Sequence, residues 1–132
     1  MKEKTHHNDI LWFSIVAILI LVFGSIPYWT AQLAQTSDLR FLGTYFDETD
    51  YAANISMMHA GEMGEWAYQM RFTSEESRPA FLRMFYILLG HVSKWFQLNV
   101  ETTYHIARWV FGFVALYSIY QLCLKAFSGR KQ

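Results

Sequence analysis

The chain contains a single cysteine, two prolines and no excess of charge of either sign. Cys123 has no second cysteine to pair with, so an intrachain disulfide is excluded and the redox compartment stays undetermined. Because the 11 basic and 11 acidic side chains balance, the composition gives no sign of a nucleic-acid partner. The 132 residues also lack a glycine-rich phosphate loop, a Gly-x-Ser-x-Gly elbow and a cysteine cluster, so the common soluble-enzyme chemistries have no basis here.

Apolar residues, in contrast, are abundant and concentrated. They make up 53% of the chain, and aromatic residues 18%, more than in an ordinary soluble domain. Residues 10–29 contain no charge, and a helix of this length, at about 1.5 Å per residue, covers the roughly 30 Å core of a bilayer. A cleaved signal peptide is the alternative, but its apolar core usually has only about 7 to 15 residues. We therefore expect a transmembrane helix at 10–29.

A second apolar run covers residues 106–127 and predicts a second transmembrane helix. Arg108 and Lys125 lie near its two ends, where long basic side chains can reach the polar interface. Thr102 or Thr103 is expected to cap this helix, because a threonine hydroxyl accepts a hydrogen bond from a free backbone N–H of the first turn.

The charges are distributed unevenly about the two apolar runs. From residue 30 to Arg108, at the start of the second run, lie nine of the eleven acidic residues but only six of the eleven basic ones. The terminal segments carry basic residues close to the spans: Lys2, Lys4, Lys125, Arg130 and Lys131. The positive-inside tendency then places residues 1–9 and 128–132 in the cytoplasm and the loop 30–105 on the opposite side. We expect an integral protein of the plasma membrane, and of a bacterial inner membrane because no strong glycosylation signal is present.

Two further helices are predicted within the loop. The stretch 48–66 contains no proline, and Tyr51, Ile55 and Met58 share one of its faces. The predicted fold is therefore all-α and integral to the membrane, with two transmembrane helices that flank an extracytoplasmic loop carrying juxtamembrane amphipathic helices.

The second loop helix is expected at 79–98. Ser77 is its expected cap, and Pro79 suits its first turn. Its charged residues favour a helix that lies in the membrane interface, and a helix that spans the membrane stays the alternative. The apolar residues that recur at a helical period are Phe81, Phe85, Leu88, Val92 and Trp95.

Three carboxylates follow the first apolar run within four residues: Asp47, Glu48 and Asp50. A carboxylate at this place can act as a general base, taking the proton of an acceptor hydroxyl as its oxygen attacks an activated sugar carbon. The structural alternative is that Asp47 caps a helix that starts at Glu48 and that Asp50 complements the helix dipole. The spacing alone favours the structural alternative.

Two other pairs of residues are candidates for ligand binding. His59 and Glu62 are three positions apart on the first loop helix, a spacing that metal ligands use but that is common by chance. We expect no cofactor, and a divalent cation at this pair stays a minor alternative. Arg78 and Arg108 are the basic residues best placed to meet a phosphate at the bilayer surface, although the sequence alone favours snorkelling for Arg108.

Short motifs in this order resemble the amino-terminal region of GT-C class membrane glycosyltransferases. Residues 46–48, Phe-Asp-Glu, resemble the Phe-Asp-Glu of protein O-mannosyltransferases. Residues 47–52 are similar to the Asp-Glu-x-x-Tyr-Ala run of bacterial lipid A aminoarabinose transferases. Residues 78–82 stand where these families carry Lys-Pro-Pro-Leu or His-Pro-Pro-Leu, with Ala80 replacing the second proline. Residues 107–108, Ala-Arg, resemble the pair that opens the second span in many bacterial members.

The resemblance implies a role for each matching residue. Asp47 corresponds to the catalytic base, Glu48 stands beside it, and Asp50, Tyr51, Arg78 and Arg108 are expected to contact the substrate. The donor is implied to be a dolichyl- or undecaprenyl-phosphate sugar, and the fold a bundle of many transmembrane helices.

Two spans cannot enclose a lipid-phosphate sugar, so we expect the chain to be an amino-terminal module, inactive alone, that needs further transmembrane helices or a partner membrane subunit. The alternative function is a non-enzymatic small membrane subunit that uses its aromatic-rich loop helices to dock against a larger membrane protein.

Overall fold

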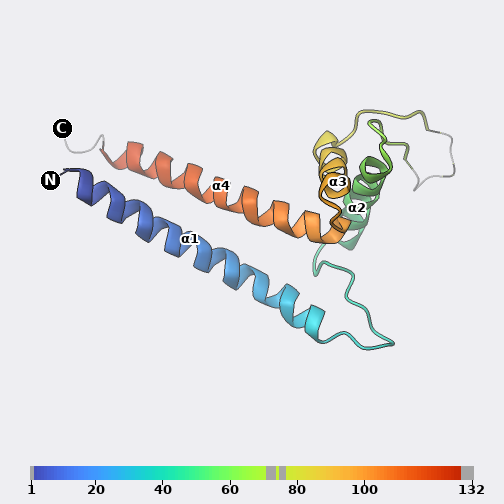
Figure 1. The fold of residues 1–132 in the computed structure, drawn as a ribbon, viewed down its shortest axis with the longest axis horizontal. Helices are drawn as coiled ribbons and strands as arrows, with labels where there is room; N and C mark the ends of the chain where they lie inside the picture. The colour runs from blue at the N-terminus through green and yellow to red at the C-terminus, as the bar shows by residue number, and fades with distance from the viewer. Residues whose placement is uncertain (1, 71–73, 75–76, 129–132) are drawn as a thin grey trace. The chain divides into compact units, whose positions relative to one another are not determined.

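The computed structural model describes residues 2–70, 74 and 77–128. Its regular elements are four helices, shown in Figure 1: α1 (Lys2–Leu33), α2 (Glu48–Met63), α3 (Met84–Phe96) and α4 (Val100–Ser128). The one β-type pairing in this part of the chain is an isolated bridge between Tyr68 and Ala80. The all-helical prediction is therefore confirmed. The helices α1 and α4 are longer than the expected spans, whereas α2 and α3 are shorter than the expected loop helices.

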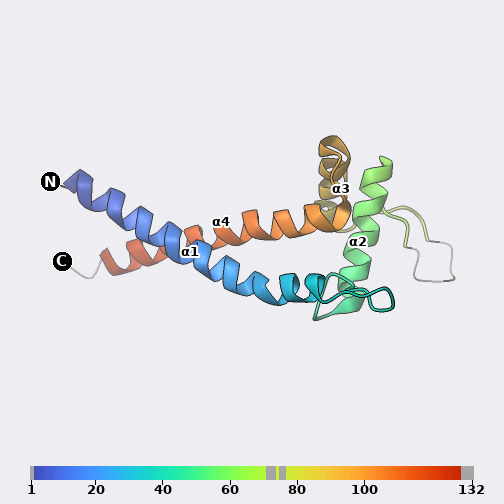
Figure 2. The same cartoon turned by 60° about the horizontal axis from the view of Figure 1, so that its bottom comes forward.

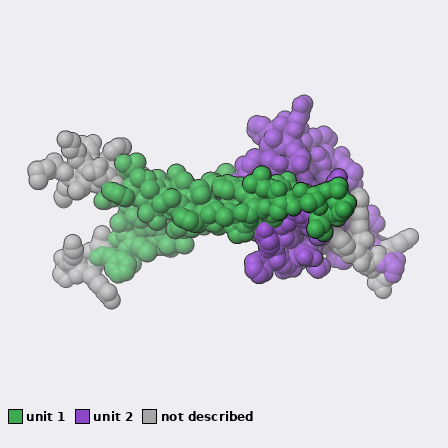
Figure 3. Space-filling view, turned by 90° about the horizontal axis from the view of Figure 1, so that it is seen from below, with its two compact units in different colours: residues 1–39, 108–132 green, residues 40–107 purple. Residues whose placement is uncertain are grey.

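The chain divides into two compact units, coloured separately in Figure 3. Unit 1 comprises residues 1–39 and 108–132, and unit 2 comprises residues 40–107. The helix α4 therefore contributes its first turns to unit 2 and the rest of its length to unit 1.

Two helical segments are long and apolar enough to cross a membrane. The segment Asp9–Leu33 has a mean hydropathy of 2.5 and the segment Val100–Phe127 one of 1.5. Their large apolar side chains are mostly exposed within this chain, among them Trp12, Phe23 and Leu122. A core helix of a soluble protein would bury such side chains, so these two helices need a non-aqueous environment or a large apolar partner.

Within unit 1, α1 and α4 contact each other as antiparallel helices. Phe13 stacks on Tyr120, with 4.6 Å between the ring centroids, near the end of α4. Ser25, twelve positions further along α1, bonds instead to Arg108, near the beginning of the unit 1 part of α4. The Lys2 end of α1 and the Ser128 end of α4 therefore lie at the same end of the pair (Figure 1).

Within unit 2, α2 and α3 pack side by side through two glycines (Figure 2). A Cβ added at Gly61 would overlap the carbonyl oxygen of Ile87, and one added at Gly90 would overlap the carbonyl oxygen of Met58. Each helix therefore needs a residue without a side chain at this contact. Such close approach of two backbones is typical of helix pairs with small residues in the interface. The surrounding core is formed by Met57, Met58, Ala60, Tyr68 and Ile87.

The predicted start of the second loop helix is wrong. Its first residue is Met84, and the residue before it, Arg83, has the left-handed backbone conformation. Pro79 precedes the helix, because the neighbouring Ala80 exchanges two backbone hydrogen bonds of 3.0 Å with Tyr68. Ser77 does not cap α3, since its hydroxyl donates to the carbonyl oxygen of Met70.

The cap predicted for the last helix is also wrong. The side-chain oxygen of Asn99 accepts a hydrogen bond of 2.7 Å from the backbone N–H of Thr102, so Asn99 takes the capping role. The hydroxyl of Thr103 donates instead to the carbonyl oxygen of Asn99. Asparagine and threonine are both good capping residues, so the local pattern did not decide between them.

The apolar face predicted for the second loop helix is largely exposed. Packing against α2 involves the other side of α3, including Ile87, Gly90 and Ser93. The exposed apolar residues on and next to α3 are Phe81, Phe85, Leu88, Trp95 and Phe96. Unit 2 therefore carries an apolar surface for which the described residues provide no cover.

Candidate functional site

Asp47 caps α2, as the structural alternative predicted. Its backbone is left-handed, with φ 52° and ψ 59°. The backbone N–H of Asp50 donates a hydrogen bond of 3.2 Å to Oδ1 of Asp47. An aspartate tolerates the left-handed region better than most residues, since its short polar side chain bonds locally. The Asp47 side chain is exposed, and its carboxylate has acceptor sites beyond the one that the cap uses.

Arg83 ties the first turns of α2 to the start of α3. Its Nη1 donates a hydrogen bond of 2.9 Å to Oδ1 of Asn54, a residue that is 7% exposed. Its Nη2 lies 3.5 Å from Oδ1 of Asp50. The carboxylate of Asp50 therefore faces an arginine of its own unit. The sequence interpretation did not assign Arg83 to the site, because it placed Arg83 within the predicted helix 79–98.

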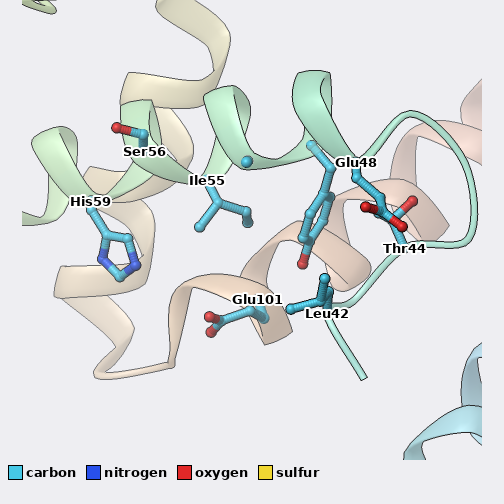
Figure 4. Close-up of a pocket in the computed structure, with 9 residues that line it drawn as sticks. Leu42, Thr44, Glu48, Ile55, Ser56, His59 and Glu101 are labelled. Carbon is cyan, nitrogen blue, oxygen red and sulfur yellow. The ribbon is translucent and has the colours of Figure 1, made fainter. Parts of the chain in front are cut away.

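A cavity of about 560 Å³ lies along one face of α2 (Figure 4). Its size is within the range of about 300–1,000 Å³ that is usual for ligand pockets. The lining residues on α2 recur at helical spacing, which places them on one face of that helix. The full lining consists of Leu42, Thr44, Glu48, Tyr51, Ala52, Ile55, Ser56, His59 and Glu101. The cavity thus includes Glu48 and Tyr51 of the predicted site, together with Glu101, which the sequence interpretation missed.

Tyr51 is held firmly at the cavity wall. Its side chain is 8% exposed, and its ring meets that of Tyr104 edge-on at 5.2 Å between centroids. On another side, Gly43 approaches so closely that an added Cβ would overlap the Tyr51 hydroxyl. Gly43 also has φ +91°, a conformation that favours glycine. The absence of a side chain at residue 43 therefore leaves the space that the Tyr51 hydroxyl occupies.

Two acidic side chains determine the charge of the cavity. Glu48 and Glu101 both line it, and its described lining residues include no lysine or arginine. His59 is engaged with Glu62, with 3.0 Å between Nδ1 and Oε2. The cavity therefore combines negative charge with an apolar wall of Leu42 and Ile55.

The pair that was considered for a metal ion forms a contact of its own instead. Within the described part of the chain, no group of three or more His, Cys, Asp or Glu side chains is arranged to hold a metal ion. His59 and Glu62 thus provide two ligand atoms, which bond to each other.

Arg78 does not line the cavity. Its side chain is exposed, and it lies two positions before Ala80 of the Tyr68–Ala80 bridge. It is therefore accessible to an anion, but the structure does not bring it to Glu48.

Arg108 belongs to unit 1, where its head group is fixed on α1. Its Nη2 donates a hydrogen bond of 3.0 Å to the hydroxyl oxygen of Ser25, which also accepts one of 2.9 Å from Nε1 of Trp109. Ser25 itself donates to the carbonyl oxygen of Leu21 and is 2% exposed. The guanidinium lies over the ring of Tyr28, 4.0 Å from its centroid. Cation–π contact and hydrogen bonding thus hold a charge in an apolar helix pair.

Replacing Ser25 by alanine should loosen this helix pair. The change removes the acceptor shared by Arg108 and Trp109, and a buried donor left without an acceptor costs about 1–3 kcal/mol. We expect the free energy of unfolding to fall by that amount in a titration with denaturing detergent. Ser14→Ala is the matched control, because the Ser14 hydroxyl is exposed and donates only to Ile10 of its own helix. Equal stability of the two variants would contradict the role of Ser25.

Comparison with known proteins gives no match. No protein-family model, no curated protein and no solved structure is similar to this chain. The resemblance to GT-C class glycosyltransferases therefore rests on the short motifs alone.

Proposed function

We propose that this chain is the first-loop module of an inverting glycosyltransferase that uses a polyprenyl-phosphate sugar, with Asp47 as general base. The observation that carries the proposal is the position of an exposed carboxylate at the start of α2, directly before Glu48, which lines a cavity of ligand size. The cap fixes one carboxylate oxygen of Asp47 against the Asp50 amide and leaves the other for a substrate.

The proposed reaction is a single displacement at the anomeric carbon of the sugar. The oxygen of an acceptor hydroxyl forms a bond to the anomeric carbon of the sugar as the bond to the carrier phosphate breaks. Asp47 takes the proton of that hydroxyl, and the carrier phosphate leaves with the electron pair of the broken bond. Attack opposite to the leaving group inverts the configuration at the anomeric carbon, and a single base is sufficient for this.

The membrane supplies the setting of this reaction. The helices α1 and α4 are proposed to span it, because their large apolar side chains are exposed within the chain. The Lys2 end of α1 and the Ser128 end of α4 are then both cytoplasmic, and unit 2, which holds most of the acids, is extracytoplasmic. Residues 97–99 alone join α3 to α4, so the exposed aromatic face of α3 is proposed to lie in the membrane interface.

Arg108 and Arg78 are proposed to serve the carrier phosphate. Arginine offers five N–H donors, and the contacts of Arg108 with Ser25 and Tyr28 leave further donors for an anion. Arg78 is exposed in unit 2 and adds a second positive charge. The bound lipid and further transmembrane helices, from a longer chain or a partner subunit, complete the enclosure of the donor.

A non-enzymatic subunit is the second candidate. The exposed aromatic face of α3 favours it. Phe85 and Trp95 on this face are exposed, and aromatic residues are enriched in the core of protein–protein interfaces. This function needs Phe85, Trp95 and Trp66 and tolerates changes at Asp47, Glu48 and Arg108. The enzymatic function instead needs Asp47, Glu48 and Arg108 and tolerates changes at Phe85, Trp95 and Trp66.

The test is a transfer assay. The chain is purified in mild detergent with the membrane proteins that accompany it and is supplied with an undecaprenyl-phosphate hexose labelled in the sugar. The proposal predicts a labelled glycoside with inverted anomeric configuration. A product of retained configuration, or no transfer in any such preparation, would contradict it.

A further inference from the structure

The charge of the cavity along α2 determines which ligands it can hold. Glu48 comes from the first turn of α2 and Glu101 from the first turn of α4, and both line the same cavity (Figure 4). Among the described residues, neither carboxylate has a hydrogen-bond or ion-pair partner. An acid in the first turn complements the dipole of its own helix, but that effect does not explain why two such acids meet at one cavity.

The lining offers almost nothing to an anion. Within the part of the chain that the structure describes, the only basic side chain of the lining is that of His59, which is bonded to Glu62. Arg83, which contacts α2, is engaged with Asn54 and Asp50 and is not among the lining residues. A cleft lined by charge of one sign concentrates ligands of the opposite sign, so the cavity selects for cations.

The rest of the lining suits an organic cation better than a metal ion. Leu42, Ala52 and Ile55 form an apolar surface beside the carboxylates, and the ring of Tyr51 adds an aromatic face. An aromatic face attracts an ammonium group, and an aliphatic surface accepts the carbon chain attached to it. A bare divalent cation, in contrast, requires three or more converging ligands, and the described residues provide no such group.

We propose that this cavity binds the ammonium group of an amine-bearing ligand between Glu48 and Glu101, with its carbon chain along Leu42 and Ile55. The amine belongs either to a soluble molecule or to an ethanolamine lipid head group. The proposal that the cavity binds an amine depends only on the cavity. The further statement that this amine belongs to the acceptor of sugar transfer rests on the proposed function, because the acceptor would enter beside Asp47.

The test compares three probes of equal length on the full chain in a maltoside detergent: butylammonium, 1-butanol and butyrate. Saturation-transfer NMR measures their binding. We expect butylammonium to bind at least about tenfold more tightly than 1-butanol and butyrate not to bind. Equal affinity for butylammonium and 1-butanol would overturn the proposal.

Variants then locate the binding. Glu101→Gln removes one of the two carboxylates and should weaken butylammonium binding about tenfold. Glu65→Gln is the matched control, since it removes a negative charge from unit 2 outside the cavity lining and should leave the affinity unchanged. Circular dichroism verifies that both variants keep their helices. An unchanged affinity in Glu101→Gln would also overturn the proposal.

Native mass spectrometry distinguishes the two sources of the amine. Retention of phosphatidylethanolamine over phosphatidylglycerol, lost in Glu101→Gln, would assign the site to a lipid head group. Butylammonium binding without this lipid preference would assign it to a soluble amine. Because these experiments measure binding, sugar transfer by a protein that does not bind butylammonium would refute this inference alone, and butylammonium binding without sugar transfer would refute the proposed function alone.

Discussion

If the proposed function is correct, we expect Asp47→Asn to abolish sugar transfer while the fold of unit 2 is retained. A general base contributes roughly a hundredfold to ten-thousandfold to a rate, and an amide cannot take the acceptor proton, so we expect the transfer rate to fall at least a hundredfold. Asparagine caps a helix as well as aspartate does and tolerates the left-handed conformation. Its side-chain oxygen can still accept the Asp50 N–H that Asp47 accepts now.

Two further measurements make this result specific. Asp38→Asn removes another exposed carboxylate, which bonds only to its neighbour Ser37, and should transfer sugar at the normal rate. Circular dichroism should show equal helix content for both variants. Normal turnover by Asp47→Asn would remove Asp47 from the mechanism and leave it as a helix cap alone.

Gly90→Ala separates α2 from α3. The added Cβ would overlap the carbonyl oxygen of Met58 and lie 2.9 Å from the backbone nitrogen of Glu62, and backbone atoms of a helix cannot yield as the end of a flexible side chain can. Overpacking of a core usually costs about 1–3 kcal/mol and occasionally more, so we expect a loss of about 3 kcal/mol in the free energy of unfolding. Hydrogen exchange of the α2 and α3 amides measures it.

A second glycine provides the control. A Cβ added at Gly24 of α1 would meet nothing within 4 Å. Alanine is the better helix former by about 1 kcal/mol, so Gly24→Ala should be neutral or stabilising. If the α2 and α3 amides exchanged as slowly in Gly90→Ala as in Gly24→Ala, this result would contradict the close contact between the two helices.

The features that local sequence rules describe were predicted well. The two long helices follow from apolar runs of sufficient length, and the spacing alone favoured Asp47 as a cap because it precedes a helical pattern with acids in its first turn. Local rules failed where a distant segment intervenes. Pro79 suits a helix start, but pairing of Ala80 with Tyr68 holds the chain extended and moves the start of α3 to Met84.

The same limit applies to the site. Glu48 and Tyr51 were predicted because they belong to one short motif, but Glu101 joins the cavity from another helix that no local pattern relates to them. Arg83 was missed for a similar reason, since its contact with Asn54 depends on how α3 packs against α2. The glycine pair that allows this packing is also invisible in the periodicity, because glycine adds nothing to an apolar pattern.

The central claim is that Asp47 faces the outer side of a membrane crossed by α1 and α4. A cysteine placed at the exposed position of Thr49, with Cys123 replaced by alanine, tests it in intact cells with a membrane-impermeant maleimide. The account predicts that Thr49→Cys is labelled in intact cells, whereas Thr5→Cys is labelled only after permeabilisation. Labelling of Thr49→Cys only after permeabilisation would place Asp47 in the cytoplasm and contradict the account.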